Sequence, residues 1–225
     1  MVLILVLITV LGCIAVQWTL HRKAARKVAE SLAHEETARF LPSLAGQEAL
    51  GGLFLHNGHT WARLDPSGAV RVGLDGFARG ILGKVDRFEL PAEGTTLRQG
   101  EPAFTAIQAG KRIGFVSPVD GVVSAVNRPI NEDLPTAKKE PYGKGWTIEI
   151  RPSDFTRNLK KLRFGAEASE WLAREMKSFS EFLVLHRAIP QEVGVTLADG
   201  GAHVEGIMEA MDGEILQIAI RKYFR

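Results

Sequence analysis

The fold is decided by the stretch from Gly94 to Val126, which reads GTTLRQGEPAFTAIQAGKRIGFVSPVDGVVSAV. Short apolar and β-branched runs, AFTAI, IGFV and VVSAV, alternate in it with turn-forming groups such as RQGE and SPVDG. Short runs of this kind, bounded by Gly, Pro, Asp and Asn, are typical of an all-β domain. The stretch therefore predicts a strand-rich fold with tight turns.

The same pattern continues outward on both sides, from Leu53 to Pro152, and supplies the further runs TWARL, AVRVGL, RFEL and TIEI. A stretch of about 100 residues is long enough to build one independent hydrophobic core. We therefore expect residues 53–154 to form a mainly β domain, either a small sandwich or a flattened barrel.

The first twenty residues, MVLILVLITVLGCIAVQWTL, contain no Asp, Glu, Lys, Arg or His. At about 1.5 Å per residue, a helix of this length spans a hydrocarbon core of roughly 30 Å. A cleaved signal peptide would carry basic residues before the apolar run and a small-residue cleavage site after it, and the sequence shows neither. Residues 1–20 are therefore predicted to form a transmembrane helix.

A basic cluster directly follows this segment: His21, Arg22, Lys23, Arg26 and Lys27. Under the positive-inside rule, basic residues after an uncharged span place the C-terminal side in the cytoplasm. We expect a single-pass protein of the inner or plasma membrane, with its body in the cytoplasm and its first helix in lipid. Residues 21–52 are expected to form a basic juxtamembrane helix and a linker, since helix formers give way there to LPSLAGQEALGG.

Helical periodicity returns after Asp154, where an apolar stripe is formed by Trp171, Leu172, Met176, Phe179, Phe182 and Leu183. Pro190 ends this predicted helix, and VGVTL with ADGG then predicts a strand and a turn. The last stretch, residues 204–225, fits a helix or a strand. Residues 155–225 are thus expected to form an α-rich extension of mixed α and β structure. Its last part contains four apolar residues that either pack onto the barrel or face a partner: Ile207, Met208, Met211 and Ile215.

Composition restricts the chemistry of the chain. With 28 Lys plus Arg against 26 Asp plus Glu, the balance argues against a nucleic-acid partner. The single cysteine, Cys13, excludes an internal disulfide and a site built from several thiolates. His56 and His59 have no third ligand at a recognisable spacing, and the sequence contains no phosphate-binding loop or nucleophile elbow. We therefore expect no metal and no catalytic residue, so the protein is predicted not to be an enzyme.

An ordered set of short motifs runs through the predicted β domain: His59-Thr60-Trp61, Val72-Gly73-Leu74, Ile81-Leu82-Gly83, Gly100-Glu101-Pro102, Ser117-Pro118-Val119 and Pro141-Tyr142-Gly143. In order and spacing, this set resembles the H protein of the glycine cleavage system over residues 58–152. The resemblance implies a lipoyl-type fold, a flattened barrel of two small antiparallel sheets. Trp61 and Trp146 are expected to be core aromatics of this barrel.

The resemblance also implies a site, a hairpin-tip lysine that carries lipoamide. In the family this lysine lies ten residues after the glycine of the G-E-P turn and eight before the proline of the S-P-V turn. Counting from Gly100 and from Pro118 leads to the same residue, Gly110. The family's E-S-V-K tetrapeptide is replaced by Ile107-Gln108-Ala109-Gly110. We therefore expect a degenerate lipoylation site without a cofactor.

Lys111 is the only lysine close to the predicted tip. If Lys111 were the attachment site, the site would be shifted by one residue along the strand. A shift of one residue turns the side chain to the opposite face of the sheet. We therefore interpret Lys111 as an ordinary tip residue. Gln108, Lys111 and Arg112 are expected to be available for contact with a partner.

These observations lead to one hypothesis and two alternatives. The hypothesis is a membrane-anchored, non-lipoylated H-protein-like domain that serves as a structural or interaction module on the cytoplasmic face, with membrane lipid and a protein as partners. The first alternative is a tethered lipoyl carrier that is modified at Lys111. Of the three functions, only this one would require lipoate as a cofactor. The second is a periplasmic adaptor, although the helical hairpins of such adaptors do not interrupt residues 53–152.

Overall fold

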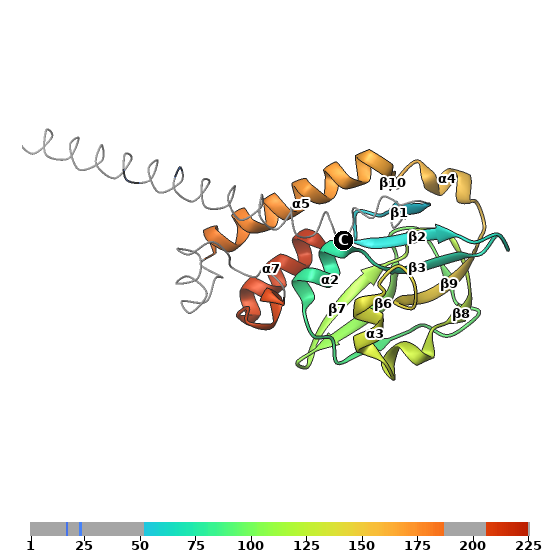
Figure 1. Ribbon diagram of the computed structural model, residues 1–225, viewed down its shortest axis with the longest axis horizontal. Coiled ribbons are helices and arrows are strands. Elements are labelled where there is room, and N and C mark those ends of the chain that lie inside the picture. The colour runs from blue at the N-terminus through green and yellow to red at the C-terminus, as the bar shows by residue number, and fades with distance from the viewer. Residues whose placement is uncertain (1–16, 18–22, 24–51, 187–205, 225) are drawn as a thin grey trace, which may run out of the picture.

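The structure is a computed structural model that describes residues 17, 23, 52–186 and 206–224 (Figure 1). Except for Gln17, Lys23 and Gly52, the predicted membrane helix, juxtamembrane helix and linker lie outside the described residues, as does the predicted strand and turn of residues 193–201. In the part of the chain that is described, no helix has the length and apolar character needed to span a membrane.

Two antiparallel sheets form a β-sandwich, which confirms the mainly β prediction. The larger sheet has the order β10-β1-β2-β3-β9-β8-β5, with bounds Arg163–Phe164, Leu53–Leu55, Thr60–Leu64, Val70–Leu74, Trp146–Pro152, Gly121–Val126 and Thr96–Leu97. The smaller sheet has the order β4-β6-β7, with bounds Arg87–Glu89, Pro102–Gln108 and Lys111–Val116.

The core lies between these sheets and follows the alternation of the strands. Val70 and Val72 of β3 pair with Ile150 and Ile148 of β9, and all four side chains are buried. Trp61 is fully buried, as predicted. A Cβ atom added to Gly73 would lie 2.8 Å from the ring of Trp61. Trp146 is only half-buried.

The sequence pattern predicts none of the short helices that lie between the strands. Helix α2 (Gly76–Leu82) contains two glycines, which lower helix propensity. It is stabilised locally by Asp75, whose Oδ1 accepts a hydrogen bond from the backbone N–H of Ala78 at 2.9 Å. Its apolar face is buried in the core, so packing rather than propensity determines the helix. The other short helices after β8 and β9 are η1 (Arg128–Asn131), α3 (Leu134–Lys139) and α4 (Phe155–Leu159).

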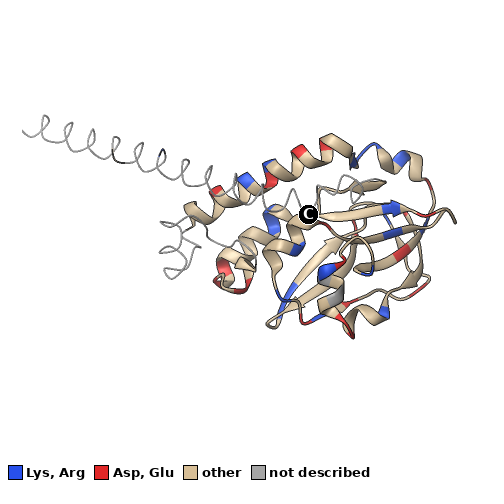
Figure 2. Cartoon of the chain, viewed as in Figure 1, with Lys and Arg blue, Asp and Glu red and all other residues tan. Residues whose placement is uncertain are grey.

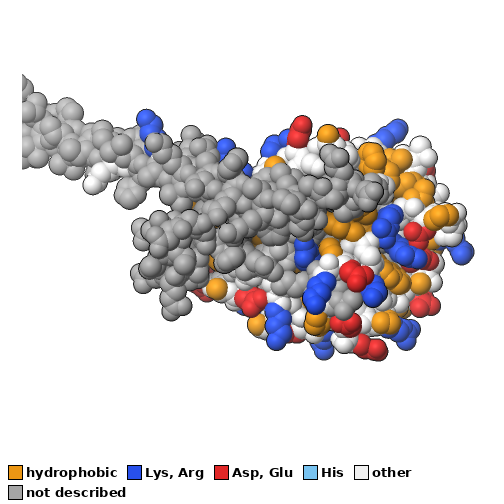
Figure 3. All heavy atoms as spheres, in the orientation of Figure 1, with side chains coloured by type: hydrophobic (Ala, Val, Ile, Leu, Met, Phe, Trp, Pro, Cys, Tyr) orange, Lys and Arg blue, Asp and Glu red, His pale blue; other side chains and the backbone are white. Residues whose placement is uncertain are grey.

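The predicted C-terminal helix is confirmed as α5 (Gly165–Leu185). All six residues of its apolar stripe are buried, while charged residues mark its outer side in Figure 2. Between β9 and α5, the chain adds the edge strand β10, whose Phe164 pairs with Phe54 of β1. Apolar side chains reach the surface over this end of the sandwich (Figure 3), where Phe164 is 50% exposed.

The last segment, for which the sequence fitted a helix or a strand, is helical: η2 (Ile207–Glu209) and α7 (Gly213–Tyr223). In Figure 1, α7 lies beside α2, and the backbone N–H of Gly206 donates to the carbonyl oxygen of Gly80 at 2.8 Å. Ile207, Met208 and Met211 are buried, and Ile215 is half-buried and packs against the core. Of the two possibilities for this apolar set, packing onto the barrel is therefore the one observed.

Candidate functional site

The hairpin β6–β7 ends in a two-residue turn, because Gln108 pairs directly with Lys111. The two turn residues, Ala109 and Gly110, have φ angles of 47° and 75°. Left-handed angles at both positions are those of a type I′ turn, which suits the twist of a hairpin. A Cβ on Gly110 would meet no other atom within 4 Å. Gly110 therefore lies at the outermost point of the hairpin, with open space around it and no side chain to carry a group.

The expectation that Gln108 is available at the surface is wrong. Its residue is only 1% exposed, and its Nε2 donates hydrogen bonds to the carbonyl oxygens of Leu82 and of Lys84, the latter at 3.2 Å. Carbonyl groups at and beyond the C-terminal end of a helix lack intrahelical partners, so a buried side-chain amide is a suitable donor for them. Gln108 thus fixes the hairpin to the end of α2.

Lys111 is half-buried and bound to the C-terminal segment. Its Nζ donates a hydrogen bond to the carbonyl oxygen of Met211 at 3.1 Å. The two residues are 100 positions apart, so local sequence pattern could not reveal this contact. The amine nearest to the tip is therefore held against the segment between η2 and α7.

Arg112 is the one residue of the three that remains exposed. Its Nη2 lies 2.6 Å from Oε2 of Glu89, which also pairs with Arg87 at 2.9 Å. The hydrogen bond from Arg112, with the charge of both arginines, lowers the pKa of Glu89. Because these groups face solvent, the pairs add little to stability. They direct the Arg112 side chain across β6 toward Glu89 of β4.

A buried histidine lies on the side of the barrel that the C-terminal extension covers. His59 is fully buried, and its Nδ1 lies 2.8 Å from Oδ2 of Asp75. Its Nε2 lies 3.9 Å from Oε2 of Glu175, which is ion-pair distance but too long for a direct hydrogen bond. The ring stacks between Phe77 at 4.1 Å and Trp171 at 4.8 Å. His59 thus joins β2 and α2 to α5.

Two opposing effects act on the pKa of His59. Burial lowers it, but the Asp75 carboxylate and Glu175 raise it, and the net direction is upward from 6.5. By the same contact, the pKa of Glu175 is lowered by His59, although burial opposes this shift. His56 differs, because burial and the neighbouring cations lower its pKa to about 4. The two histidines therefore have opposite charge preferences near neutral pH.

The two histidines do not form a metal site with their neighbours. Instead, His56 Nδ1 accepts a hydrogen bond from the backbone N–H of Gly58 at 3.0 Å, which closes the turn before β2. In residues 52–186 and 206–224, no group of three or more His, Cys, Asp or Glu side chains is arranged to hold a metal ion.

The C-terminal segment covers the face of the barrel between α2 and the hairpin. Phe224 meets Phe115 of β7 edge-to-face, with ring centroids 5.1 Å apart, and lies 5.9 Å from His59. At the other end of the segment, the backbone N–H of Lys84 donates to Glu209 Oε1 at 2.5 Å. With the contact of Lys111 to Met211, the segment therefore borders the hairpin from its tip to its base.

Comparison with known proteins gives one family. The family model described as "Glycine cleavage H-protein" matches residues 53–175, which comprise the sandwich and the first half of α5. The glycine cleavage system H protein of Xanthomonas campestris pv. campestris is 34% identical over 107 residues, 48% of this chain and 82% of that protein. The H protein of Teredinibacter turnerae is 35% identical over 98 residues, 44% of this chain and 75% of that protein.

A solved structure is also similar, the crystal structure of a glycine cleavage system H protein from Mycobacterium marinum. It aligns with a TM-score of 0.46 and 26% sequence identity, over 56% of this chain and 97% of that one.

Proposed function

Because this chain belongs to the glycine cleavage H-protein family, we propose that it uses the family's carrier scaffold as a non-lipoylated module. In this role the domain is a structural or interaction element, held at the cytoplasmic face of a membrane by its N-terminal segment. Its function is to bind a protein partner and not to carry a reacting group.

One observation carries the proposal. The residue at the hairpin tip is Gly110. The adjacent amine, that of Lys111, donates a hydrogen bond to the carbonyl oxygen of Met211 in the C-terminal segment. A lipoyl group is attached through an amide on the lysine Nζ, so an attaching enzyme must reach that atom. The hydrogen bond to Met211 and the half-buried position both oppose such access.

Amine labelling tests how far Lys111 is protected. A hydrogen bond worth about 1 kcal/mol corresponds to roughly fivefold protection. We therefore expect Lys111 to react with an acylating reagent about five times more slowly than Lys144, whose side chain is 71% exposed. Peptide mass spectrometry of briefly labelled full-length protein measures both rates. Equal rates would remove the main support for the proposal.

Membrane attachment is supported by the charge-free segment 1–20 and by the basic cluster that follows it. Reporter fusions at the C-terminus test this part, since we expect activity from a cytoplasmic reporter and none from one that works only outside the cytoplasm. The reverse result would favour the periplasmic adaptor. Recovery of the full chain in the soluble fraction would refute anchoring.

A second candidate function is favoured by the family itself, a tethered lipoyl carrier modified at Lys111. This function requires the hydrogen bond between Lys111 and Met211 to open and the side chain to leave the C-terminal segment. The two candidates therefore differ in a measurable property, the presence of a lipoyl amide on Lys111.

A further inference from the structure

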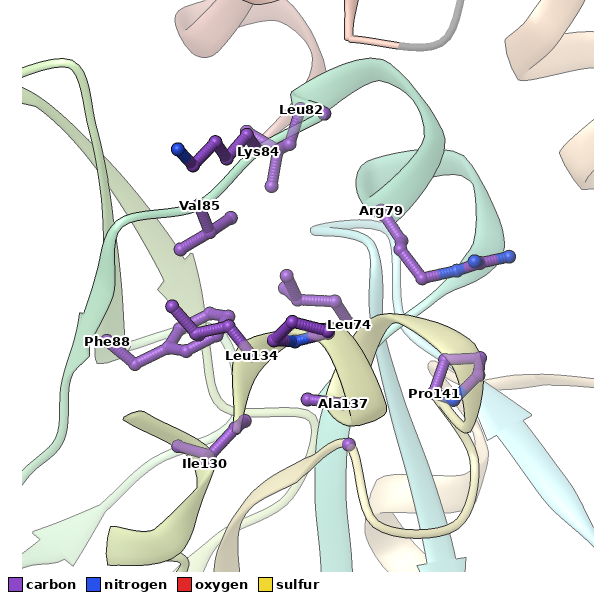
Figure 4. Close-up of a pocket in the computed structure, with 13 residues that line it drawn as sticks. Leu74, Arg79, Leu82, Lys84, Val85, Phe88, Ile130, Leu134, Ala137 and Pro141 are labelled. Atoms are coloured by element: carbon purple, nitrogen blue, oxygen red, sulfur yellow. The ribbon is translucent and has the colours of Figure 1, made fainter. Parts of the chain in front are cut away.

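A hollow of about 390 Å³ opens between α2, the segment that leads to β4, and the η1–α3 region (Figure 4). Its walls are mainly aliphatic, and they include Leu74, Leu82, Val85, Phe88, Ile130 and Leu134. In Figure 4, these side chains surround one shared space. The hollow is separate from the hairpin tip, although Gln108 is bonded to the carbonyl groups of Leu82 and Lys84 beside it.

The charged side chains that line the hollow are both cations, Arg79 and Lys84. In Figure 4 their charged ends lie at the two sides of the hollow and point away from its apolar centre. Lys84 is exposed, so its ammonium group can follow a ligand head at the rim. A carboxylate, that of Glu209, contacts the backbone N–H of Lys84 but does not line the hollow. The site thus has an apolar interior and a cationic rim.

We propose that this hollow binds a linear aliphatic carboxylate of about eight to ten carbons. At roughly 30 Å³ for each water-sized group, 390 Å³ holds about a dozen non-hydrogen atoms. The aliphatic walls suit a methylene chain, and the exposed ammonium group of Lys84 at the rim suits an anionic head. This site and its ligand are independent of whether the hairpin carries lipoate.

Chain length gives the binding a quantitative signature. Each added methylene that enters the hollow strengthens binding about fourfold. Titration of the full chain in lipid nanodiscs with sodium hexanoate, octanoate, decanoate and dodecanoate is therefore expected to show rising affinity that levels off once the hollow is full. Empty nanodiscs give the background that is subtracted.

Two matched variants locate the site. Ala137 lines the hollow, so Ala137→Phe fills it and is expected to weaken decanoate binding at least tenfold. Ala166 is exposed at the start of α5, so Ala166→Phe is expected to leave binding unchanged. In the wild-type chain, decanoate is expected to shift the methyl NMR signals of Val85 and Leu134, and to leave that of exposed Val122 in place.

The head group is tested with decanol and decyltrimethylammonium, which carry the same chain. Decanoate is expected to bind roughly two- to fivefold more tightly than decanol, because a solvent-exposed ion pair contributes about that much to affinity. The ammonium compound is expected to bind most weakly of the three. Lys84→Glu is expected to weaken decanoate binding and to leave decanol binding unchanged. Three results would overturn the proposal. Decanoate could bind Ala137→Phe as tightly as the wild-type chain, or no binding could remain after the signal of empty nanodiscs is subtracted. The ammonium compound could also bind as tightly as decanoate.

Discussion

Replacement of His59 by alanine is expected to lower the free energy of unfolding by about 3–5 kcal/mol, because it leaves Asp75 buried without its ionic partner. Asp75 is fully buried, and Nδ1 of His59 is 2.8 Å from its Oδ2. The same substitution removes the ring that stacks on Phe77 and Trp171. Urea unfolding of the full chain at pH 6 measures the loss.

The dependence of this stability on pH follows from the raised pKa of His59. A group whose pKa is higher in the folded state stabilises the fold fully below its unfolded value of 6.5. That contribution is lost as the pH rises through the folded-state pKa. We therefore expect the wild-type stability to decline above about pH 6.5, and His59→Ala to remove that decline.

His56→Ala is the matched control for this prediction. His56 is nearly as buried, but its pKa is lowered to about 4, so it is neutral over the range in which His59 titrates. Loss of its one hydrogen bond to the Gly58 N–H is expected to cost about 1 kcal/mol, with the decline above pH 6.5 unchanged. If both variants cost the same and keep the same pH profile, the ion pair between His59 and Asp75 does not stabilise the fold.

Replacement of Phe224 by alanine is the second change with a large expected effect. Phe224 is 6% exposed and contacts both Phe115 and His59, so truncation leaves a cavity where the C-terminal segment meets the barrel. Losses of about 3–5 kcal/mol are usual for such a change in a core. Urea unfolding gives the global loss, and hydrogen exchange over residues 207–224 shows whether the segment undocks first.

Phe164→Ala makes the same chemical change at a side chain that is 50% exposed, and it should cost less than about 1 kcal/mol. In Phe224→Ala, loosening of the segment should also accelerate acylation of Lys111 toward the rate of Lys144. Fast exchange over residues 207–224 in the wild-type protein, with no further change in Phe224→Ala, would show that the segment does not cover this face.

The sequence predicts those parts of the fold that depend on local periodicity. Alternating apolar runs mark the long strands, and the stripe that includes Trp171 and Phe179 predicts α5, because burial on one face repeats with the period of each element. The place of Gly110 at the tip could also be predicted, since the family spacing is counted along the chain from two flanks.

The remaining features depend on contacts between distant segments. Helix α2 contains two glycines and is stabilised by burial, so its seven residues give a weak local signal. The burial of Gln108 results from carbonyl groups at the end of α2, and the position of Lys111 results from Met211. The last helix gave no decisive pattern because a short apolar run fits a helix and a strand equally well.

The lipoylation state of Lys111 is tested most directly by the intact mass of the full chain, purified from cells that contain lipoate and a lipoyl ligase. An H protein of the family, expressed in the same cells, is the positive control. Gly110→Lys places a lysine at the open tip position and is expected to accept the group, although the φ angle of 75° there strains the new side chain. We predict that the wild-type chain has its unmodified mass. A lipoyl increment on the wild-type chain that disappears in Lys111→Arg would contradict the proposal.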